Sequence, residues 1–116
     1  MPQQLLDYEK LDAYQRSIEL LQLALKITNE LLRGESELRS QLKRAAMSVP
    51  LNIAEGSGKT SQVDRSRFHS IARGSAMECG ALMDVCAVAG FGGIEDVRKA
   101  KELVIRIVAM LSRMCR

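Results

Sequence analysis

Aromatic residues are scarce in this chain of 116 residues, which has two Tyr, two Phe and no Trp. A core with so few rings must be built from Leu, Ile, Val, Ala and Met, which favours closely packed helices. Proline is equally scarce, so few breaks are imposed on regular structure. Of the three cysteines, Cys79 and Cys86 lie two helical turns apart, about 10 Å along the axis and too far for a disulfide. We therefore expect reduced core thiols in a cytoplasmic protein.

The chain also lacks a strong charge imbalance and any long hydrophobic run. Its formal net charge is +3, and residues 33–73, with eight basic and four acidic residues, are the most positive part at +4. Such a charge attracts an anionic partner only mildly. The opening MPQQLLDYEK has no basic segment followed by an apolar one, and no stretch approaches the roughly 18 apolar residues of a membrane span. These features predict a cytoplasmic protein without a membrane partner.

Four segments show the spacing of amphipathic helices, in which apolar residues recur every three or four positions. The first, at about 11–32, is the most regular, with heptad positions Leu11, Tyr14, Ile18, Leu21, Leu25, Thr28 and Leu32. The others are expected at about 36–56, 64–89 and 94–115. Gly34 is the predicted end signal of the first helix, and Ser36 is the predicted N-cap of the second.

Helices joined by short connections, such as the GFGG run at residues 90–93, bury their apolar faces as neighbours of opposite direction. We therefore predict an all-α fold, with one domain over residues 1–116 built as an antiparallel up-and-down four-helix bundle. The length suits a single core and is too short for two domains. Pro50 cannot donate a hydrogen bond to the carbonyl group of Ala46, so a kink is expected in the second helix.

Two of the helices carry more apolar residues than one core requires. With about 100° of rotation per residue, a second apolar set points away from the core positions of the second and third helices. Contiguous apolar surface of this kind is typical of an interface, so we expect a homo-oligomer. The candidate interface residues are Met47, Leu51, Ala54, Met77, Ala81 and Val88. The alternative is an irregular bundle in which the bend at Pro50 turns these residues inward.

A polar set follows the second helix beside its core positions. Its members are Arg44, Ser48, Asn52 and Glu55, and Glu78 lies at the edge of the apolar face of the third helix. A buried carboxylate requires a partner, and Arg44 is the candidate partner of Glu78. We interpret these five residues as a hydrogen-bonded network that fixes helix register. A ligand or partner pocket built on the same groups and an ordinary solvated surface are the alternatives.

No combination of residues indicates catalysis. The sequence GSGKT at residues 56–60 resembles the end of a phosphate-binding loop, but Ile53 stands where that motif requires glycine, and no strand precedes it. His69, the only histidine, has no Cys or carboxylate at a metal-binding spacing and is expected at the surface or an interface. Di-iron motifs and nucleophile–base sets are also missing from the sequence. We predict a protein that is not an enzyme, with no metal, no cofactor and no small-molecule substrate.

Basic residues occur around the connection between the second and third helices. The candidate nucleic-acid contacts, through backbone phosphates, are Lys43, Lys59, Arg65, Arg67 and Arg73. The stacking aromatic residues typical of proteins that bind single strands are missing. A solvated basic face is the simpler interpretation of the same residues.

Two segments resemble the signature of a bacterial four-helix-bundle family, which is named for proteins encoded in intervening sequences of 23S ribosomal RNA genes and is also labelled as an S23 ribosomal protein family. They are QLKRAAMSVPLNIAEG at residues 41–56 and FHSIARGSAME at residues 68–78. The opening YEKL at residues 8–11 is similar as well. The resemblance implies a four-helix bundle that assembles as a ring-shaped homopentamer. It places Arg44, Ser48, Asn52, Glu55 and Glu78 at motif positions.

The resemblance also bears on function. The ribosomal label reflects the location of the genes and does not make the protein a ribosome subunit. A distantly similar group, the accessory proteins of diversity-generating retroelements, forms basic pentamers that act with nucleic acid. The first hypothesis is therefore a non-enzymatic homo-oligomer that binds RNA or a nucleoprotein partner through its basic surface. The alternative is a protein-interaction or scaffolding module without a nucleic-acid role.

Overall fold

The chain is helical through most of the part that the structure describes. The computed structural model describes residues 5–31 and 33–115, and no strand occurs in them. In chain order the elements are the 3-10 helix η1 (Asp7–Lys10), α1 (Asp12–Asn29), the 3-10 helix η2 (Arg33–Glu35), α2 (Ser36–Ser57), α3 (Gln62–Ala89) and α4 (Ile94–Met114). The all-α prediction is confirmed, and the α-helices pack as a bundle.

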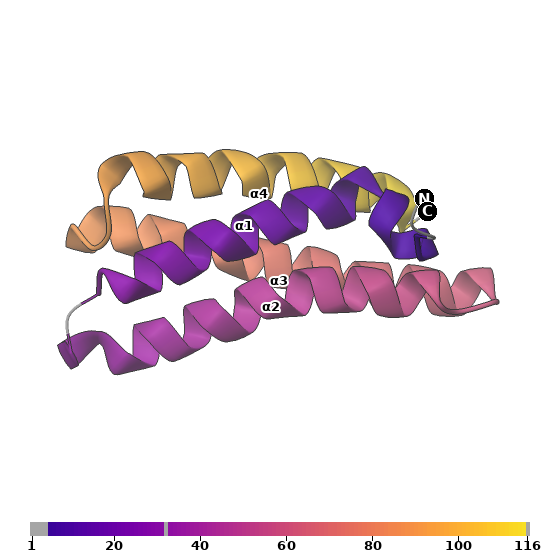
Figure 1. Ribbon diagram of the computed structural model, residues 1–116, viewed down its shortest axis with the longest axis horizontal. Helices are drawn as coiled ribbons and strands as arrows, with labels where there is room; N and C mark the ends of the chain where they lie inside the picture. Colours follow the sequence, from indigo (N-terminus) through magenta and orange to yellow (C-terminus); the bar gives the residue numbers. More distant parts are fainter. Residues whose placement is uncertain (1–4, 32, 116) are drawn as a thin grey trace.

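The α-helices lie lengthwise beside one another (Figure 1). The end of α1, the start of α2 and the α3–α4 connection share one end of the bundle, and the α2–α3 connection lies at the other end. α1 packs against α2 and α4, and α3 packs against the same two helices from the other side. α1 and α3 are therefore diagonal partners, and their outward surfaces face away from each other.

The connection between α1 and α2 differs from the predicted one. α1 ends at Asn29, before the expected boundary, and Leu32 lies outside the described residues. Gly34 belongs to the short η2 helix and does not adopt the left-handed conformation of a glycine cap. The N-cap of α2 is Glu35, and Ser36 is the first helical residue. The sequence signals identified this turn correctly but misplaced its boundaries, because η2 occupies residues that a simple cap would leave free.

The ends of α3 follow standard capping chemistry. The Ser61 hydroxyl accepts a hydrogen bond from the Asp64 backbone N–H at 3.1 Å, so the helix begins at Gln62, two residues before the predicted start. Gly90 has a φ of 74°, a left-handed conformation that glycine adopts without steric cost, and α3 ends at Ala89 as predicted.

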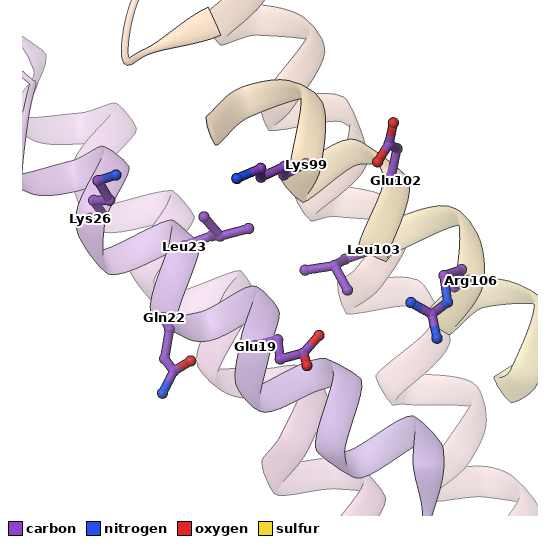
Figure 2. Close-up of a pocket in the computed structure, with 8 residues that line it drawn as sticks. All are labelled: Glu19, Gln22, Leu23, Lys26, Lys99, Glu102, Leu103 and Arg106. Atoms are coloured by element: carbon purple, nitrogen blue, oxygen red, sulfur yellow. The ribbon is translucent and has the colours of Figure 1, made fainter. Parts of the chain in front are cut away.

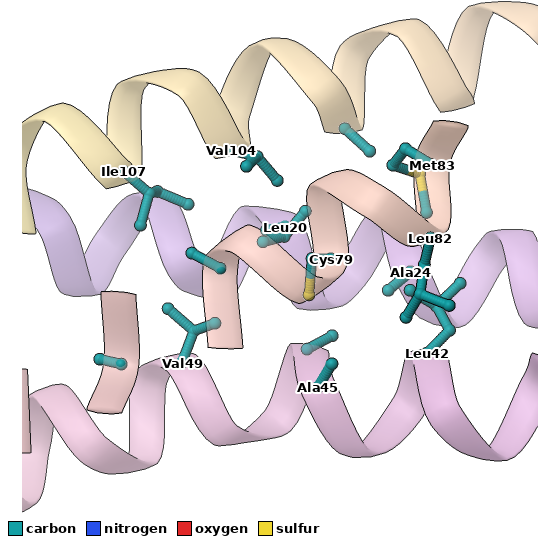
Figure 3. Close-up of a cluster of buried hydrophobic side chains, with 14 of the residues drawn as sticks. Leu20, Ala24, Leu42, Ala45, Val49, Cys79, Leu82, Met83, Val104 and Ile107 are labelled. Atoms are coloured by element: carbon teal, nitrogen blue, oxygen red, sulfur yellow. The ribbon is translucent and has the colours of Figure 1, made fainter. Parts of the chain in front are cut away.

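The core consists of aliphatic and small side chains, as the scarcity of aromatic residues predicts (Figure 3). On α2 the apolar residues with helical spacing are Leu38, Leu42, Ala45, Val49 and Ile53. All of them are buried except Leu38, which is half-buried. Pro50 is also buried within a helix that runs without interruption from Ser36 to Ser57. The kink expected at this proline stays a prediction.

α1 is rotated relative to its heptad prediction. Leu25, a predicted seam position, is 39% exposed, whereas Ser17 is fully buried. The buried Ser17 hydroxyl donates a hydrogen bond to the Tyr14 carbonyl oxygen at 2.6 Å, which removes the cost of burying it. The centre of the buried face therefore follows Leu20, Ala24 and the residues in line with them.

Candidate interaction surfaces

Exposed apolar side chains cover the outer side of α2 and α3. Of the six predicted interface residues, all are exposed except Ala54, which is half-buried. Further exposed apolar residues of α3 extend the same surface. We define the outer apolar surface as Met47 (47% exposed), Leu51 (62%), Ile71 (46%), Met77 (48%), Val85 (49%), Val88 (91%) and the exposed Ala81.

α3 contributes most of this surface because it is apolar on both its inner and its outer side. A helix that is hydrophobic around its whole circumference is normally buried on all sides. Here the outer side has open space around it. A Cβ added at Gly74 would meet nothing within 4 Å. A single copy of the chain therefore leaves this part of α3 in contact with water.

The predicted polar network is present in part, and it joins α2 to α3. The Ser48 and Ser75 hydroxyl oxygens lie 2.7 Å apart and share a hydrogen bond. The Asn52 side-chain amide donates to the Ser48 hydroxyl at 2.9 Å and to the Ser48 carbonyl oxygen at 2.8 Å. All three side chains are half-buried. Ser48 therefore connects α2 to Ser75 of α3, and Asn52 bonds to Ser48 within α2. That these residues fix the helix register stays a prediction.

The charged members of the predicted network lie apart from this group. Glu55 forms an ion pair with Lys59 one turn further along the chain, with 3.5 Å between Oε1 and Nζ. Arg44 and Glu78 are both exposed, and neither makes an ion pair with any described residue. The expected pairing of Arg44 with Glu78 is therefore not found. Both groups remain hydrated, so neither requires a charged partner.

An open groove of about 490 Å³ runs along the outside of α2. Its lining residues are Ser40, Lys43, Arg44, Met47, Ser48, Leu51 and Asn52. The sequence analysis gave a ligand or partner pocket on the polar residues of α2 as an alternative to a structural network. This groove is the feature of the structure that corresponds to that alternative.

Three of the candidate nucleic-acid contacts gather at the α2–α3 connection. The Lys59 Nζ and the Arg67 Cζ lie 5.1 and 5.0 Å from the centre of the Phe68 ring, so two cations stand against one aromatic group. The Arg65 guanidinium donates to the Lys59 carbonyl oxygen and to the side-chain oxygen of Gln62. This end of the bundle therefore combines basic side chains with a half-buried ring.

The other two candidates lie elsewhere, so the five do not form one patch. The Arg73 Nε donates to the Ser112 hydroxyl at 2.8 Å, which ties α3 to α4. Lys43 lies on α2, roughly 21 Å before the helix ends at Ser57, and Lys59 follows that end. The sequence placed these residues in one region of the chain, but the helical geometry separates them in space.

His69 is buried, which corrects the expectation of a surface position. Its side chain is 7% exposed, and it lies against Gly56 of α2. A Cβ added at Gly56 would come within 2.8 Å of the imidazole atoms Cδ2 and Nε2. Both ring nitrogens are buried without a hydrogen-bond partner of good geometry among the described residues. Spacing alone does not reveal this packing, although the glycine that permits it was visible in the sequence.

The GSGKT segment is not the loop between a strand and a helix that a phosphate-binding motif requires. α2 continues through Ser57, and Lys59 pairs with Glu55 and Phe68. Within residues 5–31 and 33–115, no group of three or more His, Cys, Asp or Glu side chains is placed to hold a metal ion.

Two hollows between helices were not predicted. A groove of about 480 Å³ separates α1 from α4, and Figure 2 shows side chains from both helices along it. Leu23 and Leu103 form its apolar part, and Lys26, Lys99 and Arg106 are its basic residues. A second hollow of about 700 Å³ lies at the α3–α4 connection, lined by Met83, Phe91, Ile94 and their neighbours. Both depend on how helices from distant parts of the chain are placed, so helical periodicity does not identify them.

The comparisons with known proteins agree with this architecture. In the described part of the chain, no helix combines the length and the hydropathy that a membrane crossing requires. No curated protein matches the sequence. A family model, described as that of the 23S rRNA-intervening sequence protein, matches residues 9–113. That match spans the four α-helices almost completely, and the chain therefore belongs to the 23S rRNA-intervening sequence protein family.

Proposed function

We propose that this protein is a non-enzymatic homo-oligomer that binds RNA or a nucleoprotein partner in the cytoplasm. The observation that carries the homo-oligomer is the outer apolar surface, which a single copy leaves in water. Contiguous apolar surface on a small domain marks an interface. The free, buried thiols of Cys79 and Cys86 fit a reducing compartment.

A second copy of the chain is the partner that this surface fits best. Its exposed Met, Leu, Ile and Val side chains are the types that homo-oligomeric interfaces bury. The family resemblance favours a ring of five copies. In such a ring the outer side of α3 would be buried, which explains why this exposed side of the helix is apolar.

RNA binding is supported by the arrangement at the α2–α3 connection. Lys59 and Arg67 flank Phe68, and repetition of this group around an oligomer multiplies a modest charge. The matched family is described as that of the 23S rRNA-intervening sequence protein, and the resemblance links such proteins to ribosomal RNA by the location of their genes. Phosphate contacts from these cations are the sequence-independent form of binding that such a surface supports.

A scaffolding module without a nucleic-acid role is the second candidate, and the same cations favour it. Lys59 is already paired with Glu55, Arg65 with Gln62, and Arg73 with Ser112. Side chains held by intramolecular contacts are less available to phosphate. The two candidates therefore differ in whether the α2–α3 connection contacts RNA.

The experiment is an RNA mobility-shift titration over a range of salt concentrations. RNA binding predicts that log K falls linearly with log salt, by about 0.7 per phosphate contact on a single strand. A Lys59→Ala/Arg67→Ala variant is expected to reduce this slope. Arg98→Ala/Lys101→Ala, near the α3–α4 connection at the other end of the bundle, is the control that also removes two positive charges. A slope near zero, or equal effects of both changes, contradicts an RNA interface at the α2–α3 connection and leaves scaffolding.

A further inference from the structure

One acidic side chain stands alone within the outer apolar surface. Ile71, Glu78 and Val85 are seven residues apart on α3, so they share one line along the helix. Glu78 is exposed and makes no ion pair or hydrogen bond with a described residue. The other acidic residue of this part of α3, Asp84, is bound by Lys101. An interface that buries Glu78 therefore has to supply hydrogen-bond donors or a cation for its carboxylate.

The α1–α4 groove holds two cations with a matching spacing. Lys99 and Arg106 are also seven residues apart, and in Figure 2 both extend from α4 beside Leu103. Neither makes an ion pair with a described residue, whereas Lys26 across the groove pairs with Asp96 at 3.0 Å. Glu19 and Glu102 also line the groove, but Glu19 pairs with Arg16 at 3.2 Å and Glu102 pairs with Arg98 at 2.7 Å. The groove thus has an apolar floor and two cations without an ion pair among the described residues, at positions about 10 Å apart along α4.

These two surfaces belong to opposite sides of one chain. α3 and α1 are diagonal in the bundle, so the outer side of α3 faces away from the α1–α4 groove. Glu78 therefore cannot reach the Lys99 and Arg106 side chains of its own chain. The two surfaces differ in shape and charge: α3 is a ridge with one carboxylate, and the groove is a furrow with two cations.

We propose that the α3 ridge of one copy seats in the α1–α4 groove of a second copy, with Glu78 between Lys99 and Arg106. This inference rests on the homo-oligomer of the proposed function and adds which surfaces meet. Ridges of α3 residues fit between the groove leucines as in ordinary helix packing. The contact pairs two different surfaces, so an open chain of copies has an unoccupied ridge at one end and an unoccupied groove at the other. Both are filled when the chain closes into a ring. The resulting symmetry is that of a closed ring rather than of a two-fold dimer.

Charge reversal in the full-length protein tests the contact, with the assembly measured by sedimentation velocity. Glu78→Lys is expected to weaken self-association at least about tenfold because it places a third cation in the groove. Lys99→Glu/Arg106→Glu is expected to do the same, and the chain with all three changes is expected to recover. The controls are Glu37→Lys and Lys10→Glu/Arg113→Glu, which reverse exposed charges elsewhere. Recovery separates a lost contact from a lost fold.

A mixing experiment separates this head-to-tail contact from a symmetric one. Ala81→Arg blocks the ridge and leaves the groove intact, whereas Lys99→Glu/Arg106→Glu blocks the groove and leaves the ridge intact. Each variant alone is expected to be monomeric, and an equimolar mixture is expected to form a one-to-one dimer. If the wild-type chain assembles but Glu78→Lys and the groove variant assemble equally well, this contact is wrong and the homo-oligomer stands. If the wild-type chain is monomeric, the homo-oligomer itself fails.

Discussion

The imidazole of His69 occupies the space that a side chain at position 56 would need. A Cβ at Gly56 would lie 2.8 Å from two imidazole atoms and 3.2 Å from the Arg65 carbonyl oxygen. The pair closes the end of the bundle where α2 meets α3. Because this contact involves a rigid ring and backbone, it leaves little room for adjustment.

Gly56→Ala is therefore expected to destabilise the protein by about 1–3 kcal/mol, the usual cost of overpacking a dense interior. Urea unfolding measures it. His69→Ala removes the ring that the new methyl group would meet, so Gly56→Ala is expected to cost less stability in that background. The higher helix propensity of alanine then offsets part of the remaining cost. Equal costs in the two backgrounds would show that His69 and Gly56 do not compete for space.

The free energy of unfolding is expected to depend on pH through the protonation of His69. Burial lowers the pKa of this imidazole below 6.5, and the positive charge of Arg65 lowers it further, against the opposing effect of the Met114 and Ile53 carbonyl groups. A depressed pKa in the folded state means that the neutral ring stabilises the fold above pH 6.5. That contribution is lost as the pH falls below 6.5, where the unfolded chain takes up the proton first.

Two measurements check this pH dependence. His69 is the only histidine in the chain, so its NMR titration is unambiguous and should give a midpoint below 6.5. Urea unfolding between pH 7.5 and 5.5 should show a loss of stability that the His69→Leu variant lacks. A midpoint at or above 6.5 would contradict the burial of the ring.

The polar contact between α2 and α3 gives a third prediction. Ser48→Ala is expected to destabilise the fold by about 1 kcal/mol, because it removes the partner of both Ser75 and Asn52. Arg44→Ala and Glu78→Ala, which change exposed groups without ion pairs, are expected to stay within about 0.5 kcal/mol of wild type. Denaturation of the dissociated chain measures all three. The reverse ranking would restore the charged network that the sequence predicts.

Thiol reactivity provides a fourth prediction. Burial raises the pKa of Cys79 to about 12 and also raises the pKa of Cys86, so both thiols stay protonated at neutral pH. Cys115 is partly exposed at the C-terminal end of α4. A colorimetric disulfide reagent is expected to modify one thiol rapidly in the native protein and all three after unfolding. Rapid loss of two or more native thiols would contradict the buried state of α3.

Helical periodicity predicted the elements well because each helix has a local cause. Leu42, Val49 and Ile53 recur on α2 with the spacing of one helix face, and all three are core residues. The glycines after Ala89 marked the end of α3. Periodicity predicted the wrong buried face for α1. Leu25 has the spacing of a core residue but is exposed, whereas Ser17 is buried although it is polar. A serine that satisfies its own hydroxyl within the helix fits a core position that an apolarity pattern does not recognise.

The contacts between helices were harder to predict because they join residues far apart in the sequence. The sequence singled out a polar set on α2, but the residue of α3 that bonds to Ser48 is Ser75, which the sequence did not indicate. Arg73 was read as part of a basic surface, yet it binds Ser112, thirty-nine positions away. Sequence spacing gives the face of a helix on which a residue lies, but not the neighbour it meets there.

The measurement that bears most directly on this account is the mass of the full-length wild-type chain in solution, determined by sedimentation velocity across the micromolar range. The account predicts an assembly with a mass several times the 12.9 kDa of one chain, which Ala81→Arg on α3 dissociates. A single species of 12.9 kDa throughout that range would contradict it, because the outer apolar surface would then face water in the functional protein.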